Sequence, residues 1–152
     1  MKMGKIEFEV VRISERHLDD IAEIERLSFS HPWTREGLMT LVRENGVGFA
    51  AIDKESGKVL AYAGMVIAAD EGSITDVATH PNYRRQGLAK AVMDEILRYC
   101  ELNAVSSVAL EVRESNESAI ALYDGLGFEI VGKRPRFYRS PVEDACVMIK
   151  RL

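Results

Sequence analysis

The order of hydrophobic periodicities along the chain restricts the fold more than any other feature of the sequence. Several stretches with strand periodicity come first, and strand and helix patterns then alternate. The strand patterns lie at residues 47–53, 58–69, 73–79, 105–112, 128–133 and 145–151, and the later helical patterns lie at 87–102 and 117–126. Consecutive strands joined by short turns favour antiparallel pairing, whereas strand–helix–strand alternation favours parallel crossovers. The sequence therefore predicts one mixed sheet.

Three more elements come earlier in the chain. A strand with alternating apolar positions occupies about residues 6–10, a helix runs from an N-cap at Ser14 to about Phe29, and a short helix begins at Thr34. The expected fold is α/β (α+β), with a mixed central sheet of about seven strands and about four helices packed on it. Because no repeat or linker interrupts the pattern, we expect residues 1–152 to form a single domain.

Composition excludes several classes of protein. The chain has 152 residues, of which 47% are hydrophobic and 29% are charged, an ordinary globular mixture that can bury a core without disulfides. This argues against a disordered tail, a collagen-like rod and a disulfide-built miniprotein. The net charge of −4 gives no global basic field for nucleic acid. Residues 1–79 carry a net charge of −5 and residues 80–152 of +1, so we expect any anion-binding surface in the second half.

The spacing of cysteines and histidines argues against a metal site. Cys100 and Cys146 form no zinc-ligand pattern, and we expect both to be buried thiols in a reducing compartment. The three histidines are scattered and match neither a metal site nor a nucleophilic triad. No signal peptide is evident, and the longest apolar run, residues 59–69, is far shorter than the ~20 residues that span a bilayer. We therefore expect a cytoplasmic protein that binds no metal.

One segment combines the features that bind phosphate. Between the strand ending at Thr79 and the following helix, the chain reads Arg84-Arg85-Gln86-Gly87-Leu88-Ala89. Free N–H groups and the dipole at a helix N-terminus favour an anion, and a glycine lets the backbone approach it closely. The segment lacks the Gly-Lys-Ser/Thr end of a Walker loop and has one glycine where a dinucleotide fingerprint has three. The alternative is an ordinary helix start with solvated arginines.

Further motifs lie on both sides of this loop. The chain reads Leu110-Glu111-Val112-Arg113-Glu114-Ser115-Asn116, then Ala119-Ile120-Ala121-Leu122-Tyr123, then Leu126-Gly127-Phe128. It also contains His31-Pro32-Trp33-Thr34, and Tyr138 followed by Glu143-Asp144-Ala145. With Arg84 to Ala89, which fits the pyrophosphate pattern Arg/Gln-x-x-Gly-x-Gly/Ala, these stretches resemble the GNAT superfamily of acyl-CoA-dependent N-acyltransferases. Within it they look like the RimI-type branch, the ribosomal-protein-alanine N-acetyltransferases.

The resemblance spans almost the whole chain and implies acetyl-CoA as the cofactor. The cofactor-binding residues that it implies are Val77, Ala78, Thr79, Arg84, Arg85, Gln86, Gly87, Leu88, Ala89, Asn116 and Tyr123. Asn116 also precedes a helix and is suited to cap it. Two departures lie near the loop: Thr79-His80-Pro81 stands where the family often has Val-Asp-Pro, and Ala89 stands where glycine is commoner.

Glu111 is the candidate general base. Glu111 and Arg113 lie on the strand face opposite Leu110 and Val112. The strand pattern alone favours the alternative of an exposed carboxylate paired with Arg113 or another basic residue. The resemblance aligns Glu111 with the base of RimI-type enzymes.

Tyr123 is the candidate general acid. A phenol of pKa ~10 can protonate a thiolate whose conjugate acid has a pKa of ~8.5 only when it is well placed. The alternative is a core tyrosine on the helix that contains Ile120 and Leu126. The resemblance implies that this tyrosine lies beside the sulfur of CoA.

Aromatic and basic residues are expected around the acceptor. The resemblance assigns Tyr138 to seating the substrate, with Trp33 beside the same cleft, whereas ordinary packing is the alternative for both. A basic cluster, formed by Lys133, Arg134, Arg136 and Arg139, indicates a solvated rim or a neighbour of phosphate more than a nucleic-acid surface.

The function that these motifs imply is acetyl transfer from acetyl-CoA to a protein N-terminus, by direct attack within a ternary complex. The resemblance implies the N-terminal alanine of small-subunit ribosomal protein eighteen as the acceptor. Two alternatives stay open: a small-molecule amine acetyltransferase of the same fold, and a noncatalytic acyl-CoA-binding module.

Overall fold

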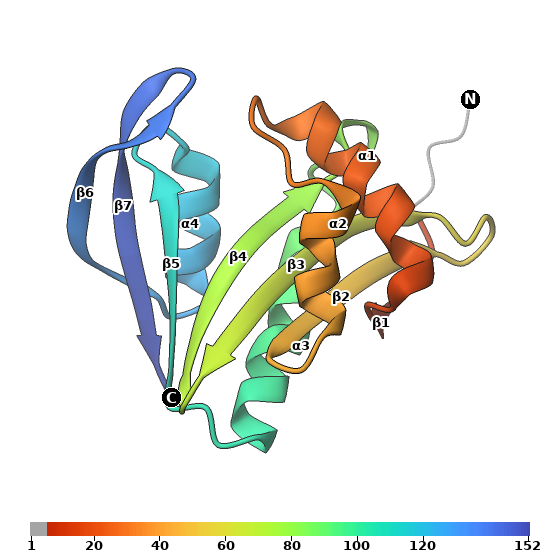
Figure 1. The fold of residues 1–152 in the computed structure, drawn as a ribbon, viewed down its shortest axis with the longest axis horizontal. Helices are drawn as coiled ribbons and strands as arrows, with labels where there is room; N and C mark the ends of the chain where they lie inside the picture. Colours follow the sequence, from red (N-terminus) through yellow and green to blue (C-terminus); the bar gives the residue numbers. More distant parts are fainter. Residues whose placement is uncertain (1–5) are drawn as a thin grey trace.

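A seven-stranded mixed sheet forms the centre of the computed structural model, which describes residues 6–152 (Figure 1). The strand order is β1-β2-β3-β4-β5-β7-β6. The strands are β1 (Phe8–Arg12), β2 (Gly46–Asp53), β3 (Val59–Ala68), β4 (Glu71–Thr79), β5 (Ser107–Arg113), β6 (Glu129–Arg139) and β7 (Val142–Arg151). Neighbouring strands are antiparallel except β4 and β5, which are parallel. The predicted mixed sheet is confirmed.

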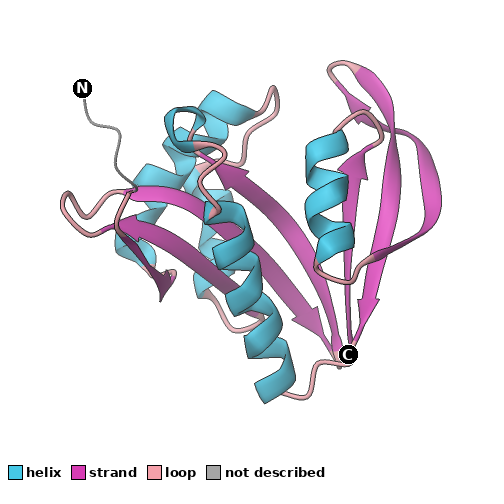
Figure 2. Cartoon of the chain, turned by 180° about the vertical axis from the view of Figure 1, so that it is seen from behind, coloured by secondary structure: helices cyan, strands magenta, loops and turns pink. Residues whose placement is uncertain are grey.

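Four α-helices pack on this sheet, as predicted. They are α1 (Leu18–Ser28), α2 (Arg35–Leu38), α3 (Leu88–Leu102) and α4 (Glu117–Gly125), and short 3₁₀ turns lie at Glu15–His17, Met39–Val42 and Pro81–Tyr83. One hydrophobic cluster lies beneath α1 and α2, and a second lies beneath α3 and α4. Figure 2 shows α3 and α4 together on one face, with α1 and α2 behind the sheet. The sheet is therefore covered on both faces.

Burial on both faces explains the long apolar run of β3. Tyr62 faces the cluster beneath α1, whereas its neighbours Ala61 and Ala63 face the cluster beneath α3, and all three are fully buried. A strand covered on both faces needs apolar residues at successive positions, so alternation disappears. Cys100 and Cys146 are buried free thiols, as predicted.

The strands β4 and β5 separate soon after they start to pair. In the described part of the chain they pair only where Glu71–Ser73 lies beside Ser107–Ala109. A bulge follows in β4, because Gly64 of β3 lies opposite Asp76 and the next residue of β3 lies opposite Ile74. A bulge bends its strand and increases the local twist. Figure 1 shows the two strands diverging towards their carboxyl ends.

The final hairpin is longer than predicted. We expected strands at 128–133 and 145–151, but β6 continues to Arg139 and β7 begins at Val142. Nearly every residue of β6 is exposed, so this strand has no apolar alternation that would reveal it. Its far end is set by cross-strand pairing of Tyr138 with Glu143.

Two kinds of feature are absent from the described residues. No helix between residues 6 and 152 is both long and apolar enough to cross a membrane. The same residues contain no group of three or more His, Cys, Asp or Glu side chains arranged to hold a metal ion.

Candidate active site

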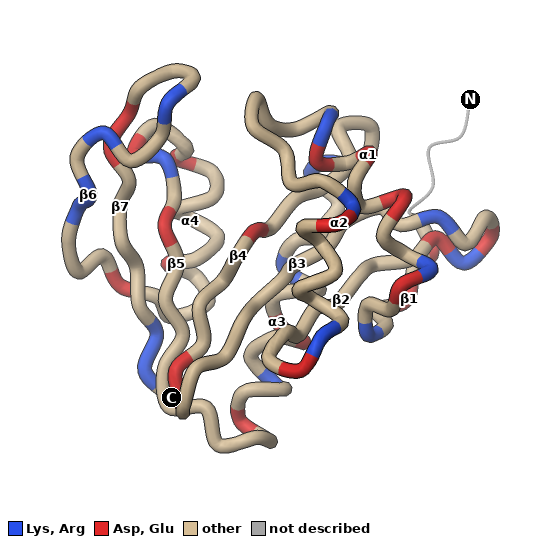
Figure 3. The backbone as a smooth tube through the Cα atoms, viewed as in Figure 1, with Lys and Arg blue, Asp and Glu red and all other residues tan. Residues whose placement is uncertain are grey.

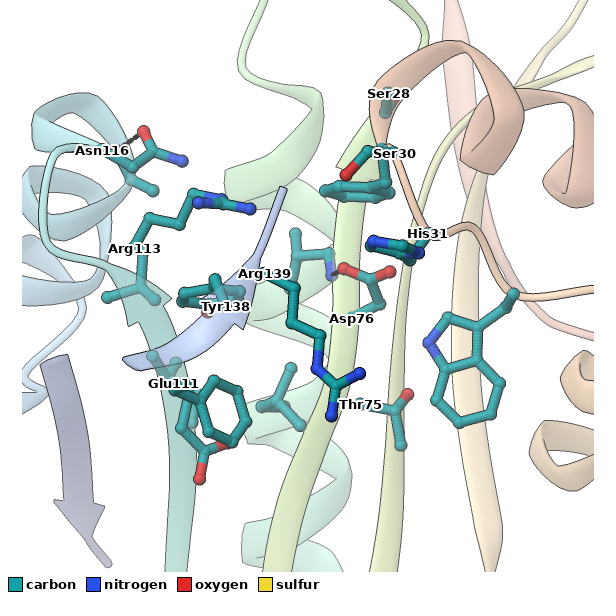
Figure 4. Close-up of a pocket in the computed structure, with 18 of the residues that line it drawn as sticks. Ser28, Ser30, His31, Thr75, Asp76, Glu111, Arg113, Asn116, Tyr138 and Arg139 are labelled. Carbon is teal, nitrogen blue, oxygen red and sulfur yellow. Dashed lines mark hydrogen bonds between the residues drawn. The ribbon is translucent and has the colours of Figure 1, made fainter. Parts of the chain in front are cut away.

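A cleft of about 620 Å³ opens where β4 and β5 separate. Its walls come from the segment after α1, from β4 and β5, from the start of α4 and from the β6–β7 connection (Figure 4). Six residues predicted from the sequence line it: Trp33, Val77, Glu111, Asn116, Tyr123 and Tyr138. The structure thus brings together candidates for catalysis, cofactor binding and acceptor binding that lie far apart in the sequence.

Two hydrogen bonds join the walls of the cleft. The hydroxyl of Ser30, after α1, donates to the backbone oxygen of Ser140 over 2.9 Å. The Nε2 atom of His31 lies 3.1 Å from the hydroxyl oxygen of Ser140. All three residues line the cleft. The contacts therefore connect the two halves of the molecule across the opening.

Glu111 lies on the half-buried face of β5 and lines the cleft, as its alternation predicted. Its Oε2 atom lies 3.3 Å from Nε of Arg134 on β6, and 29% of its side chain is exposed. The sequence left open an alternative in which Glu111 pairs with a basic residue. The structure shows both this ion pair and the position of Glu111 in the cleft. The partner of Glu111 is Arg134. Arg113 pairs instead with Glu143, over 3.1 Å.

Tyr123 is 7% exposed, and its side chain lines the cleft from α4. Its ring packs edge-on against Phe128, with 5.9 Å between the ring centroids. Burial raises the pKa of Tyr123 well above its ordinary value, and the charges of Asp76 and Tyr138 add to the shift. The hydroxyl therefore stays protonated at neutral pH, as a proton donor must.

Asn116 caps α4, as predicted. Its Oδ1 atom accepts hydrogen bonds from the backbone N–H of Ala119 and from the hydroxyl of Ser118, each over 3.2 Å. Capping therefore uses the oxygen, and the amide nitrogen is left to donate to a ligand in the cleft. Contact with the cofactor stays a prediction.

Tyr138 lies on the opposite wall from β4 and is held by its neighbours. The guanidinium of Arg113 lies 4.4 Å from the centroid of its ring. Glu143 accepts a hydrogen bond of 2.6 Å from the N–H of Ser115 and one of 3.1 Å from Arg113, and these lower the pKa of the Glu143 carboxyl. Burial, with a contribution from Glu111, raises the pKa of Tyr138 to about 12.

The predicted phosphate loop lies outside the cleft, at the carboxyl end of β4. Gly87 adopts φ +78°, a conformation that glycine takes without strain, and Arg85 has φ +64°. The first α3 hydrogen bond to Gly87 comes from the N–H of Ala91, so the preceding N–H groups have no carbonyl partner within the helix. Residues Arg84 to Gly87 are exposed. This arrangement fits an anion.

The other predicted β4 residues divide between cleft and core. The N–H of Val77 donates to Oδ1 of Asp76 over 3.0 Å, so it is not used in pairing with β3. Ala78 is 6% exposed and belongs to the cluster beneath α1, and neither it nor Thr79 lines the cleft. Cofactor contact by these two residues stays a prediction.

The sequence analysis missed two carboxyl groups beside the cleft. Glu25, on α1, is fully buried and accepts hydrogen bonds from the N–H of Trp33 (2.9 Å) and the hydroxyl of Tyr62 (2.6 Å). Asp76 lines the cleft, and burial together with the adjacent Glu25 raises its pKa well above the usual range. One signal was available, because Glu25 follows Ile21 by four residues and so lies on the buried face of the helix.

The basic cluster lies on and beside β6. Figure 3 shows positive charges along this strand. Lys133 pairs with Glu114 over 2.7 Å, and Arg134 pairs with Glu111. Arg139 lines the cleft. Part of the cluster is therefore an ion-paired rim, and part lines the cleft.

A sheet that parts between two parallel strands, with a helix start that suits an anion beside the gap, agrees with the expected acetyltransferase fold. Residues 18–128 match the model of the acetyltransferase (GNAT) family, so the chain belongs to this family.

Several named acetyltransferases are similar to this chain over most of its length. The chain is 33% identical, over 127 residues, to the [ribosomal protein bS18]-alanine N-acetyltransferase of Escherichia coli (strain K12), covering 82% of this chain and 84% of the relative. It is 28% identical over 130 residues to the enzyme of the same name from Haemophilus ducreyi, covering 85% and 88%. The crystal structure of the ribosomal-protein-S18-alanine N-acetyltransferase from Escherichia coli superposes with a TM-score of 0.87 at 29% identity, covering 95% and 94%. The similarity to RimI-type enzymes predicted from the motifs is confirmed.

Proposed function

We propose that this protein is an acetyl-CoA-dependent N-alpha-acetyltransferase that modifies a protein N-terminus, namely the N-terminal alanine of ribosomal protein bS18. One observation carries the proposal: Glu111 and Tyr123 face the same cleft as Trp33 and Tyr138. The similarity to bS18-alanine N-acetyltransferases over most of the chain supports the acceptor. A ribosomal acceptor places the enzyme in the cytoplasm, and we assign the whole chain to this one catalytic domain.

The residues present suit acetyl-CoA. The free N–H groups at the start of α3 and the exposed Arg84 and Arg85 fit its pyrophosphate. The edge of β4 beyond Ser73, which has no partner on the β5 side, and the amide nitrogen of Asn116 fit the pantetheine arm. When bound, acetyl-CoA supplies an acyl thioester for attack by an amine.

The acceptor amine must lose a proton before it attacks. A free α-amine has a pKa of ~8, so a sizeable fraction is neutral near pH 7, whereas a lysine with a pKa of ~10.4 is almost wholly charged. Glu111 accepts the proton of the ammonium group through a water molecule. As the new C–N bond forms and the C–S bond breaks, Tyr123 donates its proton to the leaving sulfur.

Intact-mass analysis tests this proposal. The protein is incubated with acetyl-CoA and a peptide that begins with the N-terminal alanine of bS18, and one added acetyl group is expected. The control is the same peptide with a blocked N-terminus. The peptide is chosen to contain no lysine, so the control should gain no acetyl group. Acetylation of polyamines or aminoglycosides without any peptide would establish the small-molecule alternative. Binding of acetyl-CoA with no transfer to any amine would establish the noncatalytic one.

A further inference from the structure

We propose that Asp76, backed by Glu25, is the residue that binds the α-ammonium group of the acceptor. This inference deepens the proposed function and rests on it. Three features of the structure carry it: where Asp76 lies, which groups surround it, and how its charge is compensated.

The bulge in β4 gives Asp76 its place in the cleft. Thr75 is the additional residue of the bulge, since Gly64 lies opposite Asp76 and the next residue of β3 lies opposite Ile74. Bulges beside active sites often redirect a side chain. Asp76 lines the cleft on the β4 wall, and Tyr138 and Glu111 lie on the facing wall (Figure 4).

Asp76 lies within electrostatic reach of the predicted reaction centre. Its charge contributes to the raised pKa values of both Tyr123, the candidate acid, and Tyr138, the candidate acceptor residue. A cation bound to Asp76 would therefore lie near both hydroxyl groups. An acceptor amine must occupy such a position to attack a thioester whose sulfur is protonated by Tyr123.

Of the two carboxyl groups, Asp76 is the one that is available to a ligand. Both oxygens of Glu25 are occupied, one by the N–H of Trp33 and the other by the hydroxyl of Tyr62. Glu25 is fully buried and does not line the cleft. Asp76 accepts a backbone hydrogen bond from Val77, lies beside Glu25 and Tyr62, and lines the cleft. Glu25 thus acts on the ligand through Asp76.

The two carboxyl groups have no basic partner among the described residues, and burial together with the adjacent Glu25 raises the pKa of Asp76, so without a cation Asp76 keeps its proton to higher pH than an ordinary aspartate. Within residues 6–152 neither Asp76 nor Glu25 forms an ion pair, whereas Glu111 is compensated by Arg134. Buried charges in proteins are normally paired. An ammonium group at Asp76 would supply the missing positive charge, and a neutral or anionic acceptor would not.

The titratable and charged groups around Asp76 lie on five helices or strands and one loop. They are Glu25, Tyr62, Tyr123, Tyr138, Glu111, Arg113, Arg139 and His31. Below its raised pKa the Asp76 carboxyl is protonated and offers no negative charge to a ligand. Affinity for the ammonium form should therefore increase as pH rises through that pKa, and should decrease again when the α-amine itself deprotonates near pH ~8.

Calorimetric binding distinguishes this role from a structural one. An alanine-starting peptide, and the same peptide with an acetylated N-terminus, are titrated into the protein saturated with CoA. We expect Asp76→Asn to weaken binding of the free-amine peptide at least about tenfold, equal to about 1.4 kcal/mol, and to leave binding of the acetylated peptide unchanged. Asp94→Asn on α3, which removes the same charge far from the cleft, is the matched control and should bind both peptides normally.

Two results would overturn the inference alone: equal weakening for both peptides, which indicates a structural role, or no weakening for either. Turnover of peptides by the wild-type protein is measured first, and its absence would instead overturn the proposed function together with this inference. The wild-type protein also provides a test that needs no variant. Lowering the pH from 7 through the raised pKa of Asp76 should weaken binding of the free-amine peptide only, and equal effects on both peptides would refute the assignment.

Discussion

Individual residues in the cleft differ in how their charge is compensated. Glu111 is paired with Arg134, Glu143 is paired with Arg113, and Asp76 has no positively charged partner in the described part of the chain. Burial and the adjacent Glu25 raise the pKa of Asp76, so an ammonium group beside it would favour its ionised form.

The Glu111→Gln variant tests the assignment of the base. Glutamine keeps the shape and one hydrogen-bond acceptor but cannot take a proton, so kcat should decrease about 10²- to 10⁴-fold. The KM for acetyl-CoA should stay unchanged. Steady-state kinetics provide the measurement, and Glu114→Gln is the matched control, since Glu114 does not line the cleft and pairs with Lys133. Equal rates for the two variants would exclude Glu111 as the base.

The Tyr123→Phe variant tests the assignment of the acid. We expect kcat to decrease about 10²-fold or more, because phenylalanine packs against Phe128 in the same way but has no proton to donate. Burial raises the pKa of Tyr123 above its ordinary value of 10, so the wild-type rate should show no loss from this residue below pH 10. An alkaline decrease near pH 8 that is absent in the variant would contradict this.

The predicted cofactor site lies where α3 begins and where β4 has no partner on the β5 side. Helix α3 begins with a left-handed glycine, Gly87, and leaves its first N–H groups without helical partners. Strand β4 loses its partner on the β5 side after Ser73, so its edge is open to a ligand. Both features are irregularities at the ends of otherwise regular elements.

The Gly87→Ala variant tests the role of the loop. A Cβ at Gly87 meets nothing within 4 Å, so the whole effect comes from the positive φ, at a cost of about 1 kcal/mol or a shift of the loop. We expect a raised KM for acetyl-CoA and a slightly lowered stability. Gly132→Ala is the control, since a Cβ there also meets nothing within 4 Å and its φ is not in the left-handed region. A normal KM in Gly87→Ala would argue against close approach of the pyrophosphate.

At the scale of the whole molecule, the site depends on contacts between the two halves. Glu25 and Trp33 come from the first helical layer, and Ser140 comes from the final hairpin, yet all three help to position the cleft. The Glu25–Asp76 pair connects α1 to β4 inside this region. The protonation of this pair should therefore influence the stability of the fold.

The dependence of stability on pH tests this pair. Because the pKa of Asp76 is higher in the folded state than its unfolded value of 3.8, the folded protein binds more protons in the interval between them. This contribution to stability is present at low pH and is lost as pH rises through the folded pKa. Urea unfolding should therefore show the stability of Asp76→Asn, relative to wild type, increasing as pH rises from the unfolded pKa through the folded pKa of Asp76. A constant difference would show that Asp76 is not perturbed.

Local patterns in the sequence determined the elements, their order and several site residues. Periodicity predicted the mixed sheet and the position of Glu111 on β5, and the choice of Asn before a helix predicted the cap of α4. These features depend on residues within about four positions of one another, so the sequence shows them directly. The exposed strand β6 has no such periodicity, and its length was underestimated.

Only the tertiary structure decided what these residues meet. It paired Glu111 with Arg134 instead of Arg113, separated β4 from β5 after three paired residues, and placed Asp76 beside Glu25. Such contacts join residues far apart in the chain, as with Tyr62 and Glu25, which are 37 positions apart. Their partners are selected by packing of the complete fold, because burial, strand register and compensation of charge are set by the whole set of neighbours and not by adjacent residues.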